Sequence, residues 1–335
     1  MDDRRKLQQE IADTLGAKPR IDVGAEIESR TGFLADYLRR AGGRSLVLGI
    51  SGGIDSTTAG RLCQLAVERL RNDGYDARFI AVRLPYGAQR DAADALAAID
   101  FIAPDRMLDV DIKPSADGML QALLAAGFEF PDATVQDQAL GNVKARERMI
   151  AQYAIAFAER GLVVGTDQAA EALMGFFTKF GDGACDLAPL TGLTKRQVRE
   201  IARALGAPAA LVDKVPTADL EDLRPLRPDE DSYGVSYEQI DDFLEGKPID
   251  AQAFDTIVRQ PPIDEHPEID HPVSDVGKMT GVCHARDGLE AAGNEFGKRA
   301  ADCRQIERYA GVGVQPQQSS LFGHELFAPA HGVYP

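Results

Sequence analysis

The segment SLVLGISGGIDSTTAG, residues 45–60, constrains the fold of this chain more than any other stretch. Its part LVLGI, residues 46–50, is a short and continuous apolar run, which is typical of a strand buried on both faces. A glycine-rich turn follows, and the apolar residues of 56–71 then recur at helical spacing. The segment therefore predicts a strand, a tight turn and a helix in immediate succession.

The same alternation continues along the chain. Apolar runs predict further strands at 79–82, 107–112 and 162–165. Helical periodicity predicts helices at 91–101, 138–160, 194–205 and 237–244, with Ile150, Tyr153, Ala154 and Phe157 on one face of the second. This order predicts an α/β fold with a doubly wound, mostly parallel sheet and helices on both faces. Ligands collect beyond the carboxyl ends of such strands, where Ser51 and Thr166 both lie.

The composition changes near Gln260. All five histidines and seven of the 18 prolines follow this residue, and the segment after it has no sustained periodicity. We therefore expect one domain at 1–260 and an irregular, poorly ordered C-terminal tail at 261–335. The abrupt change favours a tail that is foreign to the fold, such as one translated from a shifted reading frame, and sequencing the 3′ region of the gene would test this.

Charge and apolar content exclude several classes of protein. A formal net charge of -16 argues against a nucleic-acid partner, because duplex binding needs a basic face. No apolar run approaches the ~20 residues that span a bilayer, and the charged N-terminus is not a secretory signal. The four scattered cysteines form no disulfide framework. We therefore expect a cytoplasmic protein with no membrane partner.

The motif GISGG (49–53) has two incompatible interpretations. In hydrolases, G-x-S-x-G presents a nucleophilic serine, but this needs a neighbouring base, nearly always histidine, and residues 1–260 contain none. A phosphate-binding loop instead explains each residue: glycines point N–H groups at one anion, Ser51 and Ser56 donate from hydroxyls, and a helix begins there. Asp55 beside phosphate implies an intervening Mg²⁺. Without G-K-[ST], the loop is not of the Walker type.

At this point the motifs carry a family resemblance. SGGIDS (51–56) resembles the signature of the ATP pyrophosphatases, whose loop holds the β and γ phosphates of ATP. Four further motifs extend it to ammonia-dependent NAD synthetases: AVRLPYG (81–87), GNVKARERM (141–149), VVGTDQAAEALMGFFTKFGDGACDLAPL (163–190) and PTADLEDLRPLRPDE (216–230). The resemblance covers residues 1–260 and implies an adenine nucleotide alpha hydrolase-like fold. It implies a ligase that adenylates deamido-NAD with ATP and converts the adenylate to NAD with ammonia, releasing AMP and pyrophosphate.

The resemblance also implies residue roles. The ATP site would comprise Gly49, Ile50, Ser51, Gly52, Gly53, Ile54, Asp55, Ser56, Thr166, Lys195 and Thr217. Asp55 and Glu171 would bind Mg²⁺, and Asp55 and Lys195 would be catalytic, with Lys195 neutralising phosphate charge. Deamido-NAD would contact Arg146, Lys179 and Asp186. Without the resemblance, Glu171, Lys195 and Arg146 would be interpreted as ordinary surface residues of helices.

Three expectations remain open. Only 44 residues precede Ser45, which leaves no room for a glutaminase domain, so free ammonia or ammonia from a separate subunit is expected. The resemblance implies a homodimer and a His-Lys pair on deamido-NAD near the end of the domain, but here Pro267 follows His266. The alternatives are an ATP pyrophosphatase that adenylates a different acceptor and a catalytically impaired nucleotide-binding protein.

Overall fold

The computed structural model describes residues 3–88, 92–218, 220–223, 227–259 and 283–284. All of them belong to the first of the two units into which contacts divide the chain, Met1–Leu289. Apart from 283–284, the predicted tail at 261–335, with His266 and Pro267, lies outside the described residues.

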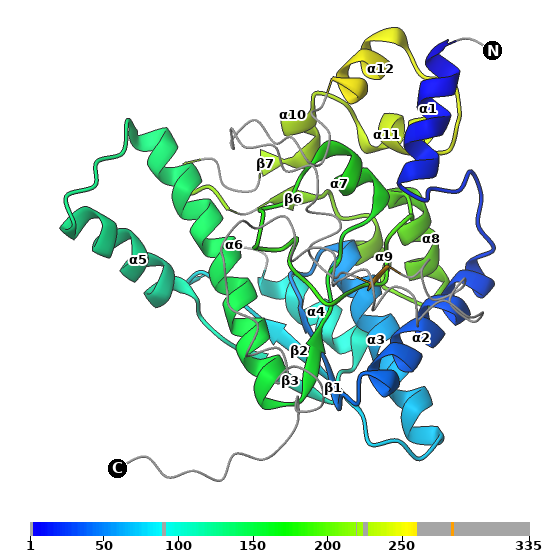
Figure 1. Ribbon diagram of the computed structural model, residues 1–335, viewed down its shortest axis with the longest axis horizontal. Helices are drawn as coiled ribbons and strands as arrows, with labels where there is room; N and C mark the ends of the chain where they lie inside the picture. The colour runs from blue at the N-terminus through cyan, green and yellow to red at the C-terminus, as the bar shows by residue number, and fades with distance from the viewer. Residues whose placement is uncertain (1–2, 89–91, 219, 224–226, 260–282, 285–335) are drawn as a thin grey trace, which may run out of the picture. The chain divides into compact units, whose positions relative to one another are not determined.

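Helices and strands alternate through the first two hundred residues (Figure 1). The helices are α1 (Asp3–Thr14), α2 (Val23–Arg40), α3 (Ile54–Asn72), α4 (Ala92–Ile102), α5 (Lys113–Ala125), α6 (Ala133–Ala158), α7 (Ala169–Met174), α8 (Lys195–Ala204), α9 (Ala209–Val212), α10 (Asp229–Tyr233), α11 (Tyr237–Leu244) and α12 (Ala251–Val258). The strands are β1 (Ser45–Gly49), β2 (Arg78–Arg83), β3 (Arg106–Asp109), β4 (Gly161–Val163), β5 (Leu187–Ala188), β6 (Thr217–Ala218), β7 (Arg227–Pro228) and β8 (Cys283–His284).

The central sheet is parallel, with the strand order β3-β2-β1-β4. In β1, Leu46 pairs with Phe79 of β2 and Val47 pairs with Val163 of β4. A bridge from Val164 to Leu187 continues the sheet beyond β4. The prediction of a parallel α/β sheet is confirmed, and the glycine-rich turn lies at the carboxyl end of the central strand β1.

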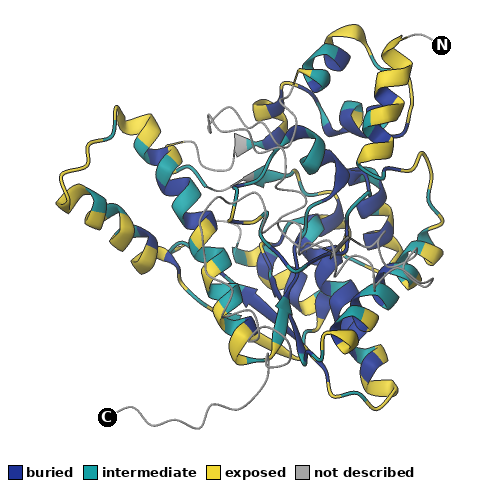
Figure 2. Cartoon of the chain, in the orientation of Figure 1, coloured by how far each residue is buried: buried dark blue, intermediate teal, exposed yellow. Residues whose placement is uncertain are grey.

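The sheet carries helices on both faces, as predicted. Leu46 and Leu48 of β1 pack into one core with α2, α3 and α8, whereas Val47 packs into a second core that includes Ala156 of α6. This alternation follows from the pleat, which points successive side chains to opposite faces. Figure 2 shows the result: β1 and β2 are largely buried between helices whose outer faces are exposed. A third, smaller core joins α1, α7, α11 and α12.

The long helix α6 was predicted at 138–160 and is observed at Ala133–Ala158. Ala156 of this helix is part of the second core, on one side of the sheet, and Tyr153 and Ile155 pack against that core. The predicted apolar face is therefore divided: Tyr153 lies toward the sheet, whereas Ile150 and Phe157 are 53% and 90% exposed. Within the described residues, no helix is long and apolar enough to cross a membrane.

Candidate active site

The glycine-rich turn joins β1 directly to α3, and it needs glycine for a steric reason. Gly52 has a φ of +80°, and a Cβ there would lie 2.5 Å from the backbone nitrogen of Ala95 in α4. Backbone atoms cannot move aside as a side chain can, so the turn and the first turn of α4 are packed main chain against main chain. Helix α3 then begins with Gly53 as its N-cap, which has no side chain to occupy the helix end. Its first N–H groups can therefore face a ligand.

Two serines stand at this turn. The hydroxyl oxygens of Ser51 and Ser56 lie 3.1 Å apart, and the N–H of Gly53 donates to Ser51 Oγ at 3.3 Å. No histidine occurs among the described residues that line the adjoining cavity. Ser51 thus has hydrogen-bonding neighbours but no imidazole base, which favours the phosphate-binding interpretation over the nucleophile.

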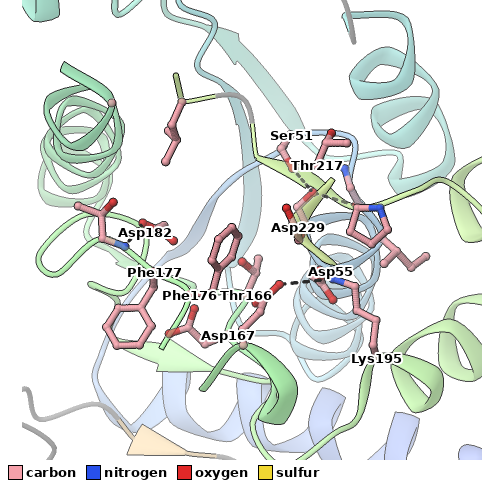
Figure 3. Close-up of a pocket in the computed structure, with 18 of the residues that line it drawn as sticks. Ser51, Asp55, Thr166, Asp167, Phe176, Phe177, Asp182, Lys195, Thr217 and Asp229 are labelled. Carbon is pink, nitrogen blue, oxygen red and sulfur yellow. Dashed lines mark hydrogen bonds and ion pairs between the residues drawn. The ribbon is translucent and has the colours of Figure 1, made fainter. Parts of the chain in front are cut away.

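A cavity of about 450 Å³ opens beside the turn (Figure 3). Residues far apart in the sequence form its wall: the turn, the segment after β4, the start of α8, the segment that leads into β6, and one side of α6. Nine of the predicted site residues line it, namely Ser51, Gly53, Ile54, Asp55, Ser56, Thr166, Glu171, Lys195 and Thr217. The predicted ATP residues are therefore brought together around one cavity.

The other predicted loop residues lie behind this wall. The Gly49 N–H donates to Gln152 Oε1 of α6 at 2.7 Å, and the Ile50 N–H donates to the carbonyl of Val82 at 2.9 Å. Together with Gly52 against α4, these contacts fix the backbone of the turn from three sides.

Lys195 is the central cation of the cavity. It is 2% exposed, and its Nζ lies 2.5 Å from Asp55 Oδ2 and 3.4 Å from Glu171 Oε1. Burial alone would lower the pKa of Lys195, but the two carboxylates outweigh burial and hold the pKa above its ordinary value. Figure 3 shows Asp55 and Lys195 meeting at one end of the cavity. Lys195 therefore carries a fixed positive charge among oxygens.

The backbone around Lys195 is held as firmly as its side chain. Thr194 caps α8 in a capping box with Gln197, and Asp241 of α11 accepts from the N–H groups of Lys195 and Arg196 at 3.0 and 2.8 Å. The ring of Tyr237 lies 4.7 Å from Lys195 Nζ. Two helices thus position one ammonium group.

The carboxyl groups of Asp55 and Glu171 are the candidate ligands of a magnesium ion. Asp55 Oδ1 is buried and has no hydrogen-bond partner among the described residues, although its other oxygen binds Lys195. A buried carboxylate oxygen without a partner costs free energy, and a hard cation is the partner it would prefer. The pKa of Glu171 is raised well above its ordinary value by burial and then by Asp55, a repulsion that a cation would relieve. These two residues therefore fit a divalent cation.

Sequence reasoning missed a second acidic pair in the cavity. Asp167 follows Thr166 at the strand end, and Asp182 lies in the FGDG turn, where its Oδ1 accepts from the Thr178 N–H at 2.9 Å. Burial, and then the charges of Asp182 and Asp55, raise the pKa of Asp167 to about 7. The position of Asp167, directly after a buried apolar run, was the signal that could have revealed it.

The three residues predicted to contact deamido-NAD do not line the cavity. Arg146 Nε donates to the carbonyl of Lys179 at 3.2 Å, so these two lie together. Asp186 accepts from the Val163 N–H at 2.8 Å and from the hydroxyl of Tyr153 at 3.4 Å. Phe176 and Phe177 do line the cavity and supply its apolar part.

Comparison with known proteins agrees with this geometry. The family model described as NAD synthase matches residues 26–268. The chain belongs to the NAD synthase family. It is 63% identical over 257 residues to the NH(3)-dependent NAD(+) synthetase of Burkholderia mallei (strain SAVP1), a match that covers 77% of this chain and 90% of that protein. It is 60% identical to the enzyme of the same name from Burkholderia cenocepacia, over 77% of this chain and 91% of the relative.

Solved structures of related enzymes have the same fold. A crystal structure of NAD+ synthetase from Burkholderia pseudomallei superimposes with a TM-score of 0.69 at 61% identity, covering 76% of this chain and 93% of that one. NMN synthetase from Francisella tularensis superimposes with a TM-score of 0.63 at 33% identity, covering 74% and 95%.

The raised pKa of Asp167 leads to a prediction about stability. The pKa of Asp167 is about 7 in the folded chain, whereas the same side chain in the unfolded chain loses its proton near pH 4. Because the folded chain holds this proton between the two values, the free energy of unfolding falls as the pH rises between them. Asp167→Asn removes this proton linkage. We compare the free energy of unfolding of the variant with that of the parent chain. This difference should shift in favour of the variant by about 1 kcal/mol or more between pH 5 and pH 8. Urea unfolding without nucleotide or Mg²⁺ measures this, and an unchanged difference between the two pH values would contradict it.

Proposed function

We propose that this chain is an ammonia-dependent NAD synthetase, a ligase that forms a C–N bond. The observation that carries the proposal is the 63% identity to an NH(3)-dependent NAD(+) synthetase over 90% of that enzyme. The cavity supports it independently, because the SGGIDS turn, Thr166, Glu171, Lys195 and Thr217 all line one space.

The reaction would proceed in two balanced steps. A carboxylate oxygen of deamido-NAD attacks the α-phosphorus of ATP, and the bond to the β-phosphate oxygen breaks, so that pyrophosphate leaves. The nitrogen of ammonia then attacks the activated acyl carbon, AMP leaves with its oxygen, and the nitrogen loses a proton to give the amide. Activation is needed because a free carboxylate is a poor acyl donor, whereas AMP is a good leaving group.

The residues of the cavity suit the first step. Gly53, Ser51 and Ser56 would donate to the phosphates at the start of α3, and Thr217 would hydrogen-bond ATP. Lys195 would neutralise charge on the departing pyrophosphate, which is stabilisation by a preorganised cation. Because Asp55 already binds Lys195, the ammonium group is in place before substrate arrives.

We infer that ATP binds with Mg²⁺. Six carboxyl groups and two lysines line the cavity, so even with Asp167 and Glu171 protonated an ATP tetra-anion would meet net negative charge unless cations accompanied it. Asp55 and Glu171 would hold the ion, which screens phosphate charge and so makes pyrophosphate a better leaving group.

We propose that Arg146, Lys179 and Asp186 hold part of deamido-NAD outside the cavity. A volume of about 450 Å³ is in the range of a single small-molecule site, so ATP and a dinucleotide together would extend beyond it. The Arg146 side chain binds the backbone of Lys179, two residues beyond Phe177 of the cavity wall, so two cationic residues lie together there, which suits a pyrophosphate-linked substrate.

A second candidate is the corresponding mononucleotide ligase, as in the NMN synthetase of Francisella tularensis at 33% identity. Both activities would amidate the same nicotinate carboxylate and differ in whether the phosphate of the nicotinate mononucleotide carries an adenylyl group. The higher identity to dinucleotide-using relatives favours deamido-NAD.

We also propose that residues 1–260 form the catalytic domain and that 261–335 is an extension outside it. The family match ends at residue 268, close to the compositional change at Gln260. Two described cysteines, Cys63 and Cys185, are buried and unpaired, which supports a reducing cytoplasm.

The proposed assembly is a homodimer. Ile150 and Phe157 lie one above the other, seven residues apart on α6, and are exposed although large and apolar. A second copy of the chain packed on this face would bury them.

Activity is the first test. The full chain with Mg-ATP, deamido-NAD and ammonium should form NAD, AMP and pyrophosphate in equal amounts. Chromatography measures the three products. Lys195→Met should reduce kcat/KM by at least about 100-fold, because it removes a preorganised charge. Lys6→Met, a surface lysine paired only with Glu10 at 3.8 Å, is the control. AMP without NAD would mean that the amide-forming half is impaired, and absence of both products would contradict the proposal.

Substrate choice is the second test. We expect kcat/KM for deamido-NAD to exceed that for nicotinate mononucleotide by at least about tenfold, because the mononucleotide lacks the half proposed to reach Arg146 and Lys179. Arg146→Met should reduce this preference toward unity and leave KM for ATP unchanged. A preference for the mononucleotide in the parent chain would favour the second candidate instead.

Oligomeric state is the third test. Phe157→Glu should convert a dimer to a monomer in sedimentation experiments, since a buried, unpaired carboxylate at an interface is strongly unfavourable. Leu96→Glu, at a 45% exposed leucine on α4, is the matched control and should remain dimeric. A parent chain that sediments as a monomer at micromolar concentration would rule out the dimer.

A further inference from the structure

Helix α6 carries a polar stripe that none of the predicted site residues explains. Asp137, Gly141 and Lys144 lie four and three residues apart, so they follow one another on a single face. All three are buried or closely packed, and all three contact residues 220–223. Gly141 and two residues next to the stripe, Gln138 and Asn142, line the cavity.

Asp137 binds the backbone of this segment. Its Oδ1 accepts from the Asp222 N–H and its Oδ2 from the Leu223 N–H, both at 2.9 Å. Two consecutive amides on the two oxygens of one carboxylate fix both the position and the direction of the chain there.

Lys144 binds the same segment from about two turns further along the helix. Its Nζ donates to the carbonyl of Leu220 at 3.0 Å and to Asp222 Oδ1 at 2.6 Å, and it lies 4.0 Å from the centre of the Tyr86 ring. The lysine side chain is 2% exposed, whereas that of Asp222 is 57% exposed. The buried ammonium group thus binds both the backbone and a side chain of this segment and lies against the Tyr86 ring.

Gly141 lets the two backbones approach. A Cβ at this position would lie 3.2 Å from the carbonyl oxygen and 3.3 Å from the Cβ of Leu220. The glycine thus brings the segment close enough for its neighbours on the stripe to bind it.

We propose that Asp137 and Lys144 are positioning residues that hold 220–223 against α6 and thereby fix Thr217 at the wall of the nucleotide cavity. Leu220, Glu221 and Thr217 all line the cavity, and only two residues separate Thr217 from Leu220. Neither Asp137 nor Lys144 lines it, so they act through the segment. The inference rests on the proposed function, in which Thr217 binds ATP.

The structural part can be tested without catalysis. Hydrogen exchange of the full chain reports on the amides of Asp222 and Leu223, which Asp137 protects. Lys144→Met should raise their exchange rate at least about tenfold, because losing a hydrogen bond from a charged donor corresponds to about that factor. Lys113→Met is the matched control: Lys113 lies 4.3 Å from the same Tyr86 ring but is bound to Asp117, and no contact joins it to the described residues of 220–223.

The functional part uses the NAD-forming assay. Lys144→Met should raise KM for ATP about tenfold and leave KM for deamido-NAD unchanged, whereas a general loss of stability would lower the active fraction without this split. Asp222→Ala is the second variant. It removes one acceptor of Lys144 from an exposed position and should shift KM for ATP in the same direction by less.

The outcomes separate the two levels of the proposal. Faster exchange with a selective rise in KM for ATP supports the inference. Unchanged exchange in Lys144→Met, or an equal rise in KM for both substrates, overturns it. If the parent chain forms no NAD, the proposed function fails, and the exchange experiment still decides whether the stripe holds the segment.

Discussion

The buried ammonium group of Lys195 is the interaction on which the rest of the candidate site depends. A lysine that is 2% exposed is strongly unfavourable unless charges surround it, and Asp55 and Glu171 supply them. The three residues come from α8, α3 and α7. Removal of Lys195 would leave two buried carboxylates without their cation, so the site and the packing of these helices are stabilised together.

The same charges prepare the cavity for a particular kind of ligand. Carboxylates outnumber lysines, and Asp55 Oδ1 has no hydrogen-bond partner among the described residues. A bare polyphosphate would be repelled, whereas a polyphosphate that carries its own cations would complete the site. The acidic composition of the chain, which argued against nucleic acid, is therefore compatible with a nucleotide.

Much of the fold was predictable because it is local. The strand at 46–50, the helix after it and the helix at 237–244 follow from apolar spacing, and they are found within a few residues of the prediction. The position of the glycine-rich turn between β1 and α3 was predictable because an apolar run leads into it and helical spacing follows it. The outward position of Ile150 and Phe157 on α6 was not predictable, because they share one apolar periodicity with Tyr153, which packs against the core. Asp137 and Lys144 were also missed, since on a helix they resemble ordinary solvated charges, and only the tertiary contact with 220–223 distinguishes them.

Helix α4 has a consequence that its surface position conceals. Its Ala95 backbone packs against Gly52 of the phosphate turn, and its Asp94 carboxylate lies 2.7 Å from the ammonium group of Lys214, just before Thr217. The first turn of α4 is thus a spacer that touches two walls of the cavity whose residues are far apart in the sequence. Asp94 and Ala95 are consecutive residues, so both contacts come from the same turn of the helix. A change that unwinds this turn would therefore disturb both walls of the cavity at once.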